Sequence, residues 1–326
     1  MKSLDRKLAS IHADPGGARD FILADAKDAD MAWGLAAPGV DHASGRPRSL
    51  ADYRDQMREI TRQGLVDIML MSVSTSELLT VEEGLFEDSA VTPAVRANDS
   101  TDIHLLAGGA YPGQPSLPFR TATAAQAVQA AGADLGLYSI TLNNDAALDR
   151  ATLQAYRDFR LEAEPQGLRH FLEVFDPNAP GARMPADLGR FLDDAIVRAL
   201  AGVPRGARPL FLKMPYHGPR AMEQLAAYDP HLVPGVLGGS AGTTHDAFHL
   251  LQDARRHGAR AALFGRKINV SEHQLTFVQH LRAIADGELE AAEAVRSYHA
   301  DLERLGITPR LPLADDLQLT ETQHHE

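Results

Sequence analysis

A single lysine inside an apolar segment is the residue of this chain best placed to do chemistry. Residues 209–215 read PLFLKMP, an apolar run that begins and ends at proline and carries Lys213 near its end. Lysine is scarce in this chain, because arginine supplies most of its 32 basic residues. Burial favours the neutral form of an amine, which can attack a carbonyl and form a Schiff base. The alternative is a lysine that reaches solvent or pairs with a carboxylate.

A second apolar segment carries one acid, Glu173, within residues 171–175. Alternate residues of a strand point to opposite sides, so Glu173 faces inward if Leu172 and Val174 face the surrounding helices. An inward carboxylate beside an inward Lys213 suits proton transfer during imine chemistry. The alternative is an ion pair that simply satisfies the lysine, and both interpretations can hold at once.

Two glycine segments, Gly238-Gly239-Ser240 and Gly265-Arg266, each follow a short apolar run near the end of the chain. Glycines let the backbone approach a ligand closely and direct N–H groups at it, and the arginine adds a guanidinium. These segments predict an anion site, most simply for phosphate. The alternative is that the glycines only form turns.

The segments that carry these residues are short apolar runs that alternate with amphipathic ones. Strands are predicted at 20–25, 66–73, 91–96, 134–141, 171–175, 210–214, 232–237 and 261–265. Helices are predicted at 49–64, 76–84, 121–131, 149–167, 185–200, 219–228, 244–257, 272–286 and 290–305. Parallel strands need helical crossovers, so eight such units predict a single-domain (β/α)8 TIM barrel over residues 1–307. Residues 308–326 show no period and are expected to form a mobile tail.

The active site of a TIM barrel lies at the carboxyl ends of its strands, and phosphate is often held after the last two. This rule brings Lys213, Glu173 and both glycine segments together. It adds Asp25, at the end of the first predicted strand, as a group that orients the lysine or binds a substrate hydroxyl. The alternative for Asp25 is a helix N-cap. Lys27, in the same segment, and His217, four residues after Lys213, are possible substrate contacts.

The composition excludes several kinds of function. The chain has 326 residues and no cysteine, which rules out disulfides, thiolate catalysis and cysteine metal sites. A formal net charge of −12 argues against a nucleic-acid partner. No apolar run reaches the length of a membrane span, and the N-terminus leads into no apolar signal core. We therefore expect a cytoplasmic protein with no membrane partner.

Taken in order, these motifs resemble the class I, Schiff-base aldolases, over roughly residues 20 to 305. The branch concerned holds archaeal-type fructose-bisphosphate aldolase, tagatose-bisphosphate aldolase, the autoinducer-2 aldolase and deoxyribose-phosphate aldolase. The resemblance implies that Lys213 forms the imine and that Glu173 is the acid/base. It also implies that Asp25 contacts the substrate or the lysine, and that neither a metal nor a cofactor is needed. In place of the archaeal-type tyrosine it puts Thr141, with Tyr138 nearby, as possible substrate contacts.

The sequence thus predicts a class I aldolase that acts on a phosphorylated sugar or ketose. The residues expected to hold the phosphate are Gly238, Gly239, Ser240, Gly265 and Arg266. One alternative is an imine-forming acyltransferase or isomerase on a phosphosugar. Another is a phosphosugar-binding protein without catalysis, because Thr141 replaces the tyrosine and Ala26-Lys27-Asp28 replaces the usual residues after the aspartate. By analogy with such barrels, a homo-oligomer is expected.

Overall fold

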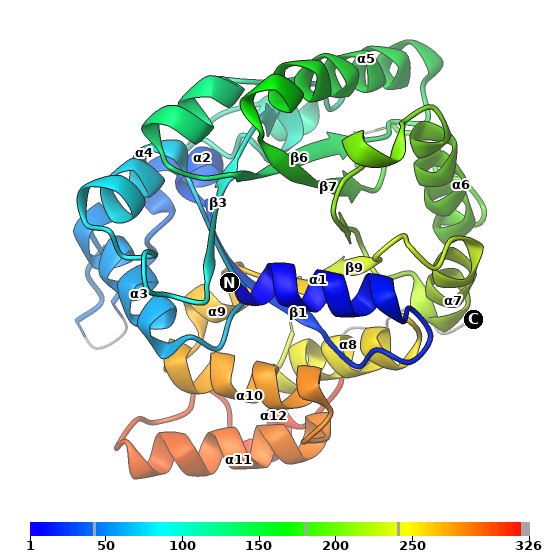
Figure 1. Cartoon of the computed structure of the whole chain (residues 1–326). Coiled ribbons are helices and arrows are strands. Elements are labelled where there is room, and N and C mark those ends of the chain that lie inside the picture. The colour runs from blue at the N-terminus through cyan, green and yellow to red at the C-terminus, as the bar shows by residue number, and fades with distance from the viewer. Residues whose placement is uncertain (42–43, 179–180, 240–241, 321–326) are drawn as a thin grey trace.

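The computed structural model describes residues 1–41, 44–178, 181–239 and 242–320, and these form the predicted TIM barrel. The eight barrel strands are all parallel and are hydrogen-bonded in the order β8-β7-β6-β3-β2-β1-β10-β9. A parallel bridge between Met214 and Val236 joins the two end strands, β8 and β9, and closes the barrel. Figure 1 shows the strands ringed by helices. The strands are β1 (Ile22–Lys27), β2 (Ile68–Met71), β3 (Thr92–Arg96), β6 (Leu135–Thr141), β7 (Arg169–Phe175), β8 (Leu212–Lys213), β9 (Gly235–Leu237) and β10 (Ala261–Phe264).

The surrounding helices begin and end close to the predicted residues. For the first of them, α3, the side chain of Ser49 accepts a hydrogen bond from the N–H of Asp52, and Gly64 ends the helix at φ 72°. Within the described part of the chain, no helix is long and apolar enough to cross a membrane. The larger helices are α3 (Leu50–Gln63), α5 (Ala146–Ala163), α6 (Leu188–Ala201), α7 (Gly218–Tyr228), α8 (Thr244–Arg256), α10 (Gln274–Asp286) and α11 (Ala291–Arg304). Shorter helical segments are α4 (Val73–Ser76), η2 (Glu77–Glu82), η5 (Gln126–Ala130) and α9 (Arg266–Val270).

An N-terminal helix that the sequence analysis did not predict closes one end of the barrel. Helix α1 (Ser3–Ala13) lies across the opening in Figure 1. Its buried residues Leu4, Leu8 and Ile11 pack with inward-facing strand residues such as Ile68 and Phe171. Their spacing of four and then three residues is that of one helix face. This helix fills the amino-terminal end, which leaves the carboxyl ends of the strands as the open end of the barrel.

A covering segment between β3 and β6 has structure of its own. Strands β4 (Asp99–Ser100) and β5 (Pro118–Phe119) pair antiparallel. Between them lie the short helices η3 (Thr101–Ile103) and η4 (Tyr111–Gly113). The N–H of Leu105 donates to the carbonyl of Ala32, 2.7 Å away, beside the short helices α2 (Asp30–Trp33) and η1 (Gly34–Ala36) that follow β1. The two segments meet above the carboxyl ends of the strands.

Residues 308–320, part of the segment expected to form a mobile tail, pack against α8. This segment includes the short helix α12 (Leu313–Asp316). Asp316 accepts a hydrogen bond from the N–H of Thr244, at 2.7 Å, and Thr320 donates to the carboxylate of Asp246, at 2.6 Å. The contacts satisfy polar groups at the first turn of α8, and such contacts leave no hydrophobic period for a sequence analysis to detect.

Candidate active site

A cavity of about 200 Å³ lies at the carboxyl ends of the barrel strands. The residues predicted from the sequence that line it are Lys213, Glu173, Gly238, Gly239, Gly265 and Arg266. The structure therefore brings together the predicted nucleophile, the predicted acid/base and both glycine segments. Ser240, predicted with them, lies outside the described residues.

Lys213 and Glu173 are in direct contact within this cavity. Their Cα atoms are paired in the register of β7 with β8, and Lys213 Nζ lies 2.5 Å from Glu173 Oε1. The neighbours Leu172 and Val174 face the helices, so the predicted alternation is confirmed. Glu173 is 2% exposed and Lys213 is 8% exposed. A proton acceptor thus touches a largely desolvated amine, which is the geometry that imine chemistry requires.

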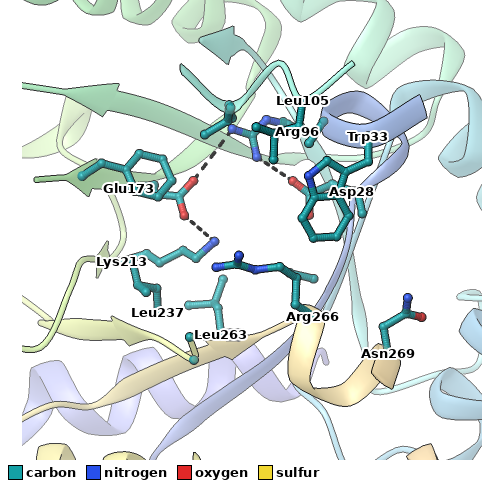
Figure 2. Close-up of a pocket in the computed structure, with 18 of the residues that line it drawn as sticks. Asp28, Trp33, Arg96, Leu105, Glu173, Lys213, Leu237, Leu263, Arg266 and Asn269 are labelled. Atoms are coloured by element: carbon teal, nitrogen blue, oxygen red, sulfur yellow. Dashed lines mark hydrogen bonds and ion pairs between the residues drawn. The ribbon is translucent and has the colours of Figure 1, made fainter. Parts of the chain in front are cut away.

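The second oxygen of Glu173 is held by a network that the sequence analysis missed. Ser139 donates its hydroxyl proton to Glu173 Oε2 at 2.6 Å, and Arg96 Nη2 lies 3.9 Å from the same atom. Arg96 also donates to Asp28 Oδ2 at 2.7 Å, as Figure 2 shows. Burial opposes the charge of Arg96, but the Asp28 and Glu173 carboxylates outweigh it and raise the pKa of the guanidinium. The buried charges are thus joined in one chain from Asp28 to Lys213.

Two members of this network carried signals that the sequence analysis did not use. Arg96 is the one cation of the predicted strand 91–96 and lies at its end. Lys213 has a similar place near the end of the predicted strand 210–214. Asp28 follows Ala24 and Ala26 at every second position, and both alanines face the barrel interior. The small inward side chains leave room for the larger groups that line the cavity. Ser139 carried no comparable signal, since a serine in a strand is ordinary.

Asp25 and Lys27 lie on the opposite face of β1, away from the cavity. Both side chains are fully buried between the barrel and its helices, with Lys27 Nζ 3.7 Å from Asp25 Oδ2. Lys27 also donates to Gln274 Oε1 at 2.8 Å. Burial raises the pKa of Asp25 to about 6 and lowers that of Lys27. Asp28 therefore occupies the place in the cavity that we predicted for Asp25.

The other three predicted substrate contacts do not line the cavity either. Tyr138 points outward and stacks on an aromatic ring of α5, with 4.4 Å between ring centroids. Thr141 donates to Asp102 Oδ2 at 3.1 Å, which ties the end of β6 to the covering segment. His217 Nε2 lies 2.9 Å from Asp176 Oδ1. None of these three side chains reaches the cavity in this structure.

The glycines beside the cavity are required by packing as well as by any ligand. A Cβ atom on Gly238 would lie 2.2 Å from the ring of Phe264, and one on Gly265 would lie 2.4 Å from the carbonyl of Ala26. Gly239 differs, because it has open space around it and adopts φ +59°, which favours glycine. Of the three, Gly239 is the one whose glycine is required by backbone conformation and not by a described neighbour.

Arg266 supplies the cationic part of the predicted anion site. Its guanidinium lies over the ring of Trp33, 5.9 Å from the centroid, and Figure 2 shows it pointing toward Lys213. No carboxylate among the described residues forms an ion pair with Arg266. An unpaired guanidinium at the edge of a cavity is suited to bind an anionic group of a ligand.

Comparison with known proteins places this geometry in a known fold. No family model matches the chain, and no curated protein matches it in sequence. An archaeal fructose 1,6-bisphosphate aldolase is similar in structure, with a TM-score of 0.65 and 15% identity, over 87% of this chain and 100% of that chain. A structure of the Schiff-base-forming fructose-1,6-bisphosphate aldolase gives 0.63 and 16%, over 88% and 100%. The enzyme of Plasmodium falciparum gives 0.52 and 13%, over 90% and 95%.

The chain has the fold of the class I aldolases. The resemblance predicted from the sequence is confirmed for this fold, and the barrel covers nearly the whole length of these solved structures. Identities of 15–16% compare the fold alone. The reaction of this aldolase-like barrel must therefore be argued from its own residues.

Proposed function

We propose that this protein is a class I aldolase that cleaves or forms a carbon–carbon bond of a phosphorylated sugar or ketose through an imine at Lys213. The observation that carries the proposal is the 2.5 Å contact between Lys213 Nζ and Glu173 Oε1. It lies in a cavity at the carboxyl ends of the strands, where barrels of this fold place their chemistry.

In the first half-reaction Lys213 passes a proton to Glu173 and attacks the substrate carbonyl carbon as a neutral amine. A carbon–nitrogen bond forms, and the carbonyl oxygen takes up a proton lost by the attacking nitrogen and becomes the hydroxyl of a carbinolamine. Glu173 then returns the proton to this hydroxyl, which leaves as water, so that a positively charged iminium remains. Ser139 and Arg96 hold the carboxylate of Glu173 in place throughout.

In the second half-reaction Glu173 accepts the proton of the substrate hydroxyl on the far side of the bond to be broken. The electron pair of that carbon–carbon bond moves to the iminium, which gives an aldehyde and a neutral enamine. Glu173 protonates the enamine, and water hydrolyses the resulting iminium to release the ketone and restore Lys213. The iminium acts as the electron sink in these steps.

The substrate's phosphate would be held at the end of the cavity that Gly238, Gly239 and Gly265 line. Gly239 lines the cavity, and Arg266 presents a guanidinium that forms no ion pair with a carboxylate of the described residues. Gly238 and Gly265 bring their strands close enough to form this end. Binding at one end would place the carbonyl near Lys213, and positioning of this kind lowers the barrier of the chemical step.

Borohydride trapping tests the proposal. The protein is incubated with dihydroxyacetone phosphate and borohydride, and the modified residue is mapped by mass spectrometry. We expect an adduct on Lys213 that the variant Lys213→Met does not form. The control Lys2→Met removes an amine that binds the backbone carbonyls of Phe86 and Ser89, and it should leave the adduct unchanged.

If no carbonyl substrate gives an adduct at Lys213, the imine mechanism is wrong. A phosphosugar that binds tightly without turnover, and equally well to Lys213→Met, would indicate a binding protein instead. An acyltransferase or isomerase would form the same adduct, and analysis of the products separates these reactions from carbon–carbon cleavage.

A further inference from the structure

We infer that the substrate of this site carries one anionic group, close to its carbonyl, and that its other end is uncharged and bears hydroxyl groups. This inference rests on the proposed function, because it concerns the substrate of the same cavity. It makes a narrower claim, since a bisphosphate would satisfy the proposed function and contradict the inference.

Charged side chains of both signs line the cavity. The described lining contains three cations, Lys213, Arg96 and Arg266, and two carboxylates, Glu173 and Asp28. Lys213 pairs with Glu173 and Arg96 pairs with Asp28. Arg266 is left as the one cation of the described lining without a carboxylate partner. The balance of charge therefore suits one anionic group.

Arg96 is not free to bind another anion. Its Nη1 donates to Asp28 Oδ2 at 2.7 Å, its Nη2 to Ser139 Oγ at 3.1 Å, and its Nε to the carbonyl of Asn98 at 2.8 Å. All three nitrogens of the guanidinium are thus engaged. Arg96 is also 5% exposed, so a change of partner would break a buried ion pair.

The position of Arg266 would place the anionic group of the substrate beside its carbonyl. Arg266 lies over the face of Trp33 and points toward Lys213, as Figure 2 shows. An anion bound by this guanidinium would lie within a few bonds of the carbon that Lys213 attacks. Both phosphate and carboxylate fit the planar donor fork of arginine, so the test must distinguish them.

Apart from the charged side chains already named, the cavity is lined mostly by apolar groups. They include Ala32, Ile103 and Leu105 as well as Trp33 under the Arg266 guanidinium. Asp28 Oδ2 is taken by Arg96, while Oδ1 accepts no hydrogen bond from the described residues. This oxygen can accept a hydrogen bond from a substrate hydroxyl, and it would repel a second phosphate or carboxylate.

Calorimetry with two sugar phosphates tests the uncharged end. Fructose 1-phosphate and fructose 1,6-bisphosphate are compared for binding to the double variant Lys213→Met/Glu173→Gln, which cannot form an imine and removes both members of the ion pair, so the balance of charge in the cavity is kept. We expect the monophosphate to bind roughly tenfold or more tightly than the bisphosphate. Adding Asp28→Asn should reduce this preference for the monophosphate, and circular dichroism checks that each variant is folded. Equal binding of the two sugars to the double variant, or tighter binding of the bisphosphate, would overturn the inference.

Trapping with small ketones tests the place of the anion. The rate of adduct formation at Lys213 should be roughly tenfold or more higher with either dihydroxyacetone phosphate or pyruvate than with uncharged dihydroxyacetone. The faster of the two anions shows whether phosphate or carboxylate is preferred. Arg266→Gln should remove the advantage, and the control Arg157→Gln, at an exposed pair with Asp158, should keep it.

The outcomes of the two claims can be told apart. If both anions trap no faster than the uncharged ketone, or if Arg266→Gln keeps the advantage, the inference is wrong and the imine mechanism stands. If no ketone is trapped at Lys213, the proposed function fails. The calorimetric ratio then still decides whether the site accepts one charge or two.

Discussion

Lys213 and Glu173 face each other across neighbouring barrel strands, with Nζ 2.5 Å from Oε1 and their Cα atoms in register. Both residues belong to the sheet, so hydrogen bonds between strands fix the distance between them. A site built on rigid strands holds reacting groups more closely than a site built on loops. The pairing also means that neither residue can be changed without leaving its partner buried and uncompensated.

The first prediction concerns Glu173→Gln, which keeps the shape of the side chain and removes its ability to take up a proton. We expect turnover to fall by about 10²- to 10⁴-fold, the usual contribution of a general acid/base. The ketone should still bind, because the anion site is untouched. Steady-state kinetics and calorimetry measure the two effects separately. Turnover close to that of the unmodified enzyme would show that Glu173 only pairs with the lysine.

The second prediction concerns the ion pair between Arg96 and Asp28. Arg96→Met leaves the Asp28 carboxylate buried without a partner, so we expect the free energy of unfolding to fall by about 3–5 kcal/mol. Adding Asp28→Asn should recover part of this loss, because it removes the unpaired charge. Urea unfolding of the two variants measures both changes. The exposed control Arg157→Met should change stability by less than about 0.5 kcal/mol.

The stability of the double variant, compared with that of the two single variants, decides whether Arg96 and Asp28 interact. If the double variant is as unstable as the sum of the two single variants, Arg96 and Asp28 do not interact in solution as they do in the structure. Partial recovery would instead show that the charges are coupled, which is what their 2.7 Å contact requires.

The barrel could be predicted from the sequence because its strands are short apolar runs separated by capped amphipathic helices. Helix α1 was missed because it lies outside the repeating units, although Leu4, Leu8 and Ile11 have helical spacing. The contacts between the tail and α8 were missed because they are polar. Periodicity detects apolar faces and does not detect polar contacts between distant segments.

The site was predicted in part, because periodicity shows which face of a strand a residue occupies but not which distant polar groups it contacts. Glu173 and Lys213 stand alone in apolar strands, so alternation assigns them to the interior. Asp25 and Asp28 both lie near the end of β1, and the choice between them depends on which face of the strand is inward. Asp28 continues the alternation of Ala24 and Ala26, whereas Asp25 lies on the other face, and the sequence analysis did not use this signal.

The third prediction concerns Asp193 on α6, a buried carboxylate away from the cavity. Among the described residues neither of its oxygens has a hydrogen-bond partner. Burial raises its pKa from 3.8 to about 7, and the neighbouring groups His217, Asp194 and Arg190 modify the shift. The folded protein thus binds a proton here that the unfolded chain releases above pH 4. Through this group, stability is lost as pH rises from about 4 to about 7.

Asp193→Asn removes this dependence, because the amide has the shape of the protonated acid and cannot ionise. At pH 8 the variant should be more stable than the unmodified protein by an amount on the order of 2 kcal/mol. Near pH 4 the two should be alike. Denaturant unfolding at both pH values measures the difference, with the exposed Asp194→Asn as control. A variant that is less stable at pH 8 would show that the Asp193 carboxylate has a partner in solution.

The fourth prediction concerns Asp316, which joins the tail to the first turn of α8. Its Oδ1 accepts from the N–H of Thr244 at 2.7 Å, and its Oδ2 lies 2.8 Å from His299 Nε2. Asp316→Ala leaves a helix N–H without an acceptor, and we expect a loss of about 1–2 kcal/mol in the free energy of unfolding. The neighbouring Asp315→Ala, at an exposed position, is the matched control and should change little.

A truncation after residue 307 extends this prediction. It removes Asp316 together with Thr320, whose hydroxyl donates to Asp246 at 2.6 Å, so it should destabilise the protein more than Asp316→Ala alone. The same truncation should weaken binding of dihydroxyacetone phosphate to Lys213→Met, because α8 begins directly after the glycine segment at residues 238–242. If truncation changes neither stability nor binding, the tail does not hold α8 in solution, and residues 308–326 would be the mobile segment that the sequence predicts.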